Sequence, residues 1–142
     1  MTKDLFGDDI PYNPLENDKV FERHIANILK PDFKDIKEQK FIPIPKPNGK
    51  KHKPDILIVD TLTIVSVKLQ NVGGTAEEKV DYEMRILQRA CELGNYRQSF
   101  IVCGGLGWTF LDDLIEHSKN FSKVKVLRYE DDKELNEIRT GN

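Results

Sequence analysis

The sequence predicts a single α/β domain in which a mixed sheet of four to five strands is flanked by helices. Its 142 residues are 38% hydrophobic and 32% charged, which is typical of one compact globular domain. Helical and alternating hydrophobic patterns follow one another in the order α-β-β-β-α-β, and then α-β-α. A meander of three strands, a crossover helix and a fourth strand together give a mixed sheet with helices on its faces.

The N-terminal half is expected to contain an arm, a helix and three strands. Residues 1–16 show no hydrophobic period and are predicted to be an extended arm. Asn17 or Asp18 caps a helix that ends at Pro31, which cannot continue it. Three strands follow, the first at a sheet edge because its prolines lack a donor for the ladder, and their ranges are 41–44, 56–59 and 62–70.

The C-terminal half begins with a long helix. Thr75 and Glu78 have the spacing of a capping box, and Gly94 ends the helix that they open. The next elements are predicted as strand, helix, strand and polar terminal helix, in the ranges 99–103, 108–117, 124–127 and 131–139. We therefore interpret residues 1–142 as one domain, with a core at 18–103 and a helix-strand-helix extension at 104–142.

Composition limits the class of protein. No apolar run approaches the ~20 residues that span a bilayer, and the N-terminus lacks the apolar core of a signal peptide, so we expect an intracellular protein without a membrane partner. Cys91 and Cys103 have no metal-ligand spacing and are predicted to be buried thiols. The formal charge of −2 does not itself indicate nucleic-acid binding, although a local basic strip can still bind phosphate.

Two of the predicted strands carry an unusual set of polar residues. Asp55 opens the second strand. Ser66, Lys68 and Gln70 alternate on one face of the third. If the two strands form a hairpin, Asp55 lies opposite the segment from Ser66 to Lys68 and on the same face. Burying such groups is costly unless they are compensated, and a metal ion with a negatively charged substrate would compensate them.

Pro54-Asp55 followed by Ser66-Val67-Lys68 resembles the PD-(D/E)xK nuclease superfamily of restriction, homing and repair endonucleases, and the resemblance covers about residues 18–103. It implies that Asp55 is a metal ligand and that Lys68 is the catalytic lysine. It also implies that Glu22 in the first helix lies near the metal. The expected cofactor is Mg²⁺, for which Mn²⁺ should substitute, and no organic cofactor is expected. Gln70 shares this face, where it would bind water or phosphate, or only satisfy a backbone group.

Ser66 departs from the family pattern, because it occupies the position of the second acidic residue. Some restriction enzymes of the superfamily have Ser or Cys there and take a carboxylate from the following helix. Glu77, at the edge of the apolar stripe, is expected to point at the sheet, and Glu78 and Asp81 are the other candidates. Without such a carboxylate, the chain would bind DNA but not cut it.

The loop before Asp55 is the candidate DNA contact, because lysines that neutralise phosphates provide much of the affinity for DNA. His52 is in addition a candidate general base, although a loop of this kind is often only solvated. The residues predicted to contact DNA are Lys46, Asn48, Lys50, Lys51, His52 and Lys53.

The function that follows is a metal-dependent DNA endonuclease of restriction or homing type, acting on double-stranded DNA. Cutting both strands needs two active sites, so a homodimer or higher homo-oligomer is expected. The alternatives are a non-catalytic DNA-binding or assembly subunit with the same fold, and a structure-specific nuclease that resolves junctions.

Overall fold

The computed structural model describes residues 11–74 and 76–140. Its elements follow the predicted order, with an α-β-β-β-α-β core and then α-β-α. Most of the predicted arm and Thr75 of the capping box lie outside the described residues, while residues 11–17 contain no helix or strand. The helices are α1 (Asp18–Leu29), α2 (Ala76–Gly94), α3 (Leu111–Ser118) and α4 (Asn136–Thr140), and the short 3₁₀ helices are η1 (Lys30–Asp32) and η2 (Tyr129–Asp131).

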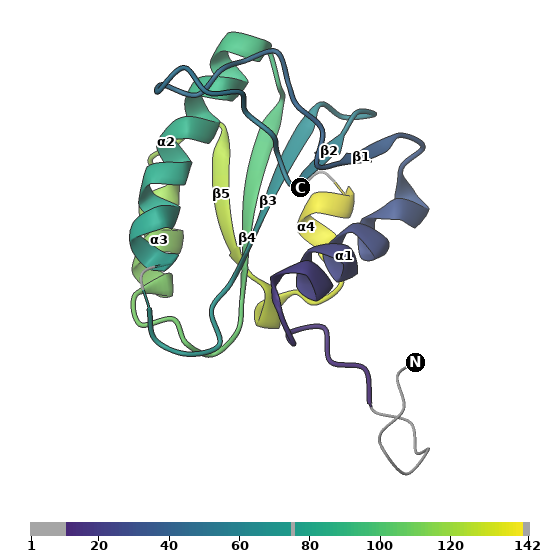
Figure 1. Ribbon diagram of the computed structural model, residues 1–142, viewed down its shortest axis with the longest axis vertical. Helices are drawn as coiled ribbons and strands as arrows, with labels where there is room; N and C mark the ends of the chain where they lie inside the picture. The colour runs from purple at the N-terminus through teal and green to yellow at the C-terminus, as the bar shows by residue number, and fades with distance from the viewer. Residues whose placement is uncertain (1–10, 75, 141–142) are drawn as a thin grey trace.

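The strands form one five-stranded mixed sheet in the order β1-β2-β3-β4-β5. β1, β2 and β3 are antiparallel neighbours, whereas β3, β4 and β5 run parallel. Figure 1 shows α2 and α3 on one face of this sheet and α1 and α4 on the other. The predicted fold class is therefore confirmed. The strand bounds are β1 (Ile36–Glu38), β2 (Ile56–Ile58), β3 (Thr63–Leu69), β4 (Gln98–Gly104) and β5 (Val124–Arg128).

Two hydrophobic cores lie on the two faces of the sheet, and β3 contributes to both. Val65 packs with Phe21 and Ile25 of α1 in one core. Ile64 packs with Met84 of α2 in the other. Because side chains alternate along a strand, Ser66 and Lys68 point to the α2 face. This alternation places the polar residues of β3 under α2.

The predicted first strand at 41–44 is wrong. In that range only Ile42 makes a β-type pairing, a single antiparallel bridge to His52. Pro43 and Pro45 lack the N–H that a ladder needs. The first strand is instead β1, a charged edge strand whose start is fixed by the Asp60 carboxylate, which accepts N–H bonds from residues 34 and 35 at 2.9 and 2.8 Å.

The start of α1 agrees with the prediction, whereas α3 and α4 begin later than predicted. The Asn17 cap is confirmed, since its Oδ1 accepts the Val20 N–H at 3.0 Å. The helix predicted from 108 begins at Leu111, and the terminal helix is limited to Asn136–Thr140.

Both cysteines are buried and free, as predicted. Within the described ranges, no helix is long and apolar enough to cross a membrane.

Candidate functional site

Asp55 lies directly before β2, where the β2–β3 ladder ends. The ladder pairs Ile56 with Val65, so its register continues to Asp55 opposite Ser66. Beyond that point the Asp55 carboxylate replaces the backbone partner, because its Oδ2 accepts the Val67 N–H at 2.8 Å. The predicted placement of Asp55 on the same face as Ser66 and Lys68 is thus confirmed.

On the α1 side, Asp55 faces a second carboxylate. The Gln39 side-chain nitrogen donates to Glu22 Oε1 at 2.6 Å and to Asp55 Oδ1 at 3.2 Å. Gln39 follows β1 directly and adopts a positive φ of 51°, which residues other than glycine adopt infrequently. A neutral amide therefore bridges two acids that come from α1 and from the start of β2.

On the α2 side, Lys68 of β3 has an ionic partner. Lys68 Nζ lies 2.6 Å from Glu83 Oε2, and the two side chains are only 28% and 20% exposed. Sequence reasoning missed Glu83. The signal was present, because Glu83 is three residues after Val80 and four before Leu87, both of which are buried in the α2 stripe.

The pKa values of these groups follow from burial and from their neighbours. Burial raises the pKa of Asp55, and the Val67 N–H and Lys68 oppose this only in part. Burial also raises the pKa of Glu22, with the Gln39 hydrogen bond acting in the opposite direction. Burial acts to lower the pKa of Lys68, but the charge and hydrogen bond of Glu83, helped by Asp55, outweigh it and raise the pKa. Lys68 is therefore firmly protonated near neutral pH.

Glu22 and Gln39 line a separate hollow on the α1 side, whereas the other groups surround a polar cavity of about 220 Å³. Asp55, Ser66, Lys68 and Glu83 line it from the sheet and α2, and the loop before β2 adds cations to the rim. His52 also lines it and is 4% exposed. Its Nδ1 is buried without a hydrogen-bond partner, and burial lowers its pKa. His52 is thus a neutral ring inside the site and not part of the solvated loop surface.

The other acidic candidates on α2 point elsewhere. The Glu77 carboxylate accepts hydrogen bonds from the Thr109 and Phe110 N–H groups, the latter at 2.8 Å, and so binds the start of α3. Asp81 faces His117 at 3.5 Å, also toward α3. Glu78 is exposed and lines a neighbouring hollow that shares Lys68 and Glu83 with the cavity. None of these three side chains lines the cavity at Asp55.

Gln70 satisfies backbone groups. It is 6% exposed, its side-chain nitrogen donates to Gly107 O at 2.8 Å, and its Oε1 accepts the Ala76 N–H at 3.0 Å. These two bonds join the end of β3 to the α2 start and to the turn before α3. These contacts support the second of the two roles predicted for Gln70, that of satisfying backbone groups.

The basic loop divides into three groups of residues. Lys46 and Lys53 line the cavity. Lys50 and Lys51 are exposed. Asn48 holds the tight turn, because its Oδ1 accepts the Lys50 N–H at 3.0 Å. The loop therefore presents cations both to the cavity and to solvent beside it.

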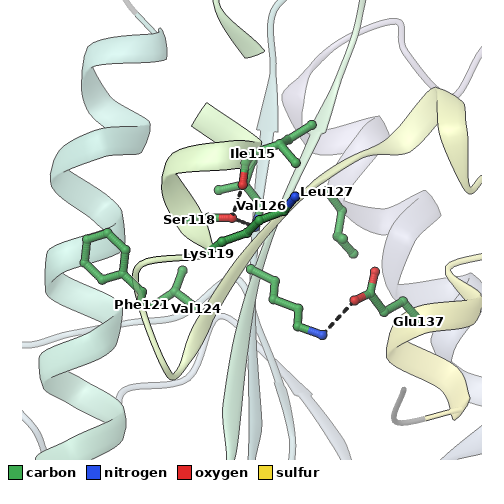
Figure 2. Close-up of a pocket in the computed structure, with 9 residues that line it drawn as sticks. Ile115, Ser118, Lys119, Phe121, Val124, Val126, Leu127 and Glu137 are labelled. Carbon is green, nitrogen blue, oxygen red and sulfur yellow. Dashed lines mark hydrogen bonds and ion pairs between the residues drawn. The ribbon is translucent and has the colours of Figure 1, made fainter. Parts of the chain in front are cut away.

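A second cavity, of about 410 Å³, lies along β5 and has a different character. Figure 2 shows an ion pair at Glu137 and hydrogen bonds at Ser118 in this cavity. Lys125 Nζ lies 2.9 Å from Glu137 Oε1. The Ser118 hydroxyl donates to Ile115 O at 2.6 Å and accepts the Val126 N–H at 3.2 Å. Lys119, which also lines this cavity, pairs with Glu116 at 2.8 Å. The charged and hydroxyl side chains of this cavity thus have partners, whereas the Asp55 cavity contains His52, whose Nδ1 has none among the described residues.

The donor set at Asp55 fits a hard cation. Within residues 11–74 and 76–140, no three His, Cys, Asp or Glu side chains are grouped closely enough to hold a metal ion by themselves. Mg²⁺, however, uses only one or two protein carboxylates and completes its shell with water and phosphate. Asp55 and Glu22 provide two carboxylates on either side of one exposed amide.

No family model matches this chain, and no curated protein matches it. Among solved structures, the chain is similar to the small subunit of the heterodimeric restriction endonuclease R.BspD6I, with 16% sequence identity and a TM-score of 0.47. The alignment covers 87% of this chain and 66% of that subunit, so the chain spans slightly less than two thirds of the subunit's length.

Proposed function

We propose that this chain is a metal-dependent deoxyribonuclease of the PD-(D/E)xK type that hydrolyses phosphodiester bonds in double-stranded DNA. One observation carries the proposal: Asp55, Lys68 and Glu83 meet in a single polar cavity whose rim carries Lys46 and Lys53. A phosphate needs cations beside it, and a hydrolytic centre needs carboxylates that can hold a metal. This cavity offers the cations and Asp55, and Glu22 lies next to Asp55 across the Gln39 amide.

We assign Asp55 and Glu22 as the ligands of Mg²⁺, with Mn²⁺ as a substitute. Held by these carboxylates, such an ion would stabilise charge on the phosphate oxygens and make an attacking water more acidic. Gln39 is exposed, so its amide can leave the space between the two acids. Glu77 and Glu78 are not needed in this assignment.

Lys68 serves as a fixed positive charge and not as a base, because its pKa is raised. Its ammonium neutralises charge on the phosphate in the transition state. Glu83 positions it, since the 2.6 Å contact holds the ammonium at the cavity. Glu83 thus brings a carboxylate from α2 to the place where Ser66 supplies none.

His52 is neutral near pH 7, because burial lowers its pKa. Its ring lines the cavity, and a neutral imidazole has one donor and one acceptor nitrogen, so it is suited to orient a water molecule by a hydrogen bond. The remaining contacts to DNA are assigned to the exposed lysines of the loop, which neutralise phosphates flanking the scissile one.

The test is cleavage of plasmid DNA in Mg²⁺ or Mn²⁺. We expect Asp55→Asn and Lys68→Met to lower the rate at least about 100-fold, because each removes a charge from the transition state. Asp81→Asn is the matched control, since this acid lies on α2 but faces α3. A wild-type protein that cuts no substrate with any divalent metal would rule out the nuclease.

A second candidate is a non-catalytic DNA-binding subunit, favoured by Ser66 at the position of the second acid. The same experiment separates the two functions, because this subunit would bind DNA in a gel-shift assay without cutting it. A homodimer is also proposed, because each chain offers one such cavity and double-strand cleavage requires two. Sedimentation of the protein with and without DNA tests that stoichiometry.

A further inference from the structure

An exposed phenylalanine lies beside the cavity and has no role in the function proposed above. Phe41 is 60% exposed. Its large aromatic ring therefore gains little of the stabilisation that burial would give it. It belongs to the loop between β1 and β2, which Figure 1 shows crossing from the sheet edge toward α2.

The loop fixes the direction of this ring. Ile42 pairs with His52, with its N–H donating to His52 O at 2.9 Å. These two residues are 6% and 4% exposed and so point inward. Because side chains alternate, Phe41 points outward, and the antiparallel register places it opposite Lys53.

Two ammonium groups lie over the ring. The Nζ atoms of Lys51 and Lys53 are each 5.5 Å from the centroid of the Phe41 ring. An ammonium at this distance is attracted to the negative face of the ring, but only weakly where water has access. The lysines can therefore leave the ring for a phosphate and uncover its face.

The ring is also continuous with the catalytic cavity, since Lys53 both lies over Phe41 and lines the cavity with Asp55 and Lys68. A DNA strand whose phosphate enters the cavity thus has its neighbouring nucleotide within the same patch of lysines. An aromatic face flanked by cations is the combination with which proteins bind unstacked bases, because each base has a π-face and each nucleotide a phosphate.

From this arrangement we infer that Phe41 is a stacking platform for an unstacked nucleobase next to the scissile phosphate, with Lys51 and Lys53 binding the flanking phosphates. The inference rests on the proposed function and adds to it a substrate class. The preferred DNA would carry an unpaired or extruded base near the cut, and not only intact duplex.

The test measures binding without cleavage, by fluorescence anisotropy in EDTA. The probes are a short labelled duplex with one bulged adenine and a fully paired duplex of the same sequence. We expect wild type to prefer the bulged duplex, and Phe41→Leu to raise its Kd for that duplex about 5- to 150-fold, as loss of one stacked base does. Phe41→Trp should retain the preference, because it keeps an aromatic face.

Phe110→Leu is the matched control, since Phe110 is also 60% exposed but lies at the start of α3. It should bind both duplexes as wild type does. If wild type binds DNA and Phe41→Leu binds each probe with the same Kd as wild type, the stacking role is overturned while the nuclease proposal stands. If wild type binds neither probe, both are overturned.

Discussion

Asp55 lies between two glutamates whose charges are balanced in different ways. On the α2 side, Glu83 contacts the Lys68 ammonium at 2.6 Å. On the α1 side, Glu22 shares only the neutral amide of Gln39 with Asp55. The pKa values of Glu22 and Asp55 are both raised, first by burial. On the α1 side Arg23 offsets the charge of Glu22 only in part. The negative charge of the site is therefore least balanced there, and this side is where an external cation would be stabilised most.

The largest expected effect concerns Asp55, which lies between the two glutamates. We expect Asp55→Asn to weaken Mn²⁺ binding more than the ~10–100-fold typical of residues that only support a ligand, because it removes a charged donor. Without metal, the same variant should be more stable than wild type by about 1 kcal/mol, since it removes a partly buried charge. Calorimetric titration and thermal melts with and without Mn²⁺ measure both.

The two halves of this prediction have opposite signs, which distinguishes a functional carboxylate from a structural one. A structural Asp55 would lose stability on substitution, because its Val67 hydrogen bond would outweigh the cost of its charge. A less stable Asp55→Asn protein with unchanged Mn²⁺ affinity would contradict our assignment.

The next effect concerns the α2 side. Glu83→Gln leaves the Lys68 ammonium without its ionic partner in a site where both side chains are largely buried. We expect the free energy of unfolding to fall by about 1–2 kcal/mol, less than for a fully buried pair, because glutamine still accepts a hydrogen bond. Urea denaturation measures it.

Glu78→Gln is the control for that experiment, because Glu78 is an exposed acid on the same helix and should change stability little. If the two variants unfold alike, the Lys68–Glu83 pair is not what stabilises the α2 side, and the contrast between the two glutamates fails.

Most of the fold could be predicted because hydrophobic periodicity is strong in the interior elements. α2 and β3 are long, β3 packs in both cores and α2 in one of them, and their types follow directly from the spacing of apolar residues. β1 could not be found in this way. It has one hydrophobic residue, Ile36, among charges, and it is a strand only because β2 and the Asp60 carboxylate hold its backbone.

The site divides similarly into local and non-local parts. Asp55 and Lys68 were predictable because a short hairpin sets their register. The partner on α2 depends on how that helix lies across the sheet, which no local pattern gives. Glu77 has suitable chemistry, but its carboxylate binds the backbone at the start of α3, whereas Glu83, six residues later, contacts Lys68. Only the packed structure distinguishes the two.

The smallest expected effect concerns Glu22, on the α1 side. The pKa of Glu22 is raised above its ordinary value of 4.5, so the folded protein binds this proton more readily than the unfolded chain does. Metal-free stability therefore gains from this group as pH falls through the raised pKa toward 4.5. Near pH 7 the ionised Glu22 costs stability, and Glu22→Gln should be more stable than wild type by roughly 0.5 kcal/mol, a small value because solvent screens this half-exposed side chain.

The measurement is the difference in unfolding free energy between wild type and Glu22→Gln, from about pH 7 to about pH 5. His24 and His52 also titrate as pH falls, and burial lowers both of their pKa values, so they oppose the gain from Glu22. They contribute almost equally to both proteins and therefore largely cancel in the difference. The advantage of the variant should shrink steadily on acidification, since wild type then becomes protonated at Glu22. An advantage that grows instead would mean that ionised Glu22 stabilises the fold, and that the α1 side has no charge for a metal ion to balance.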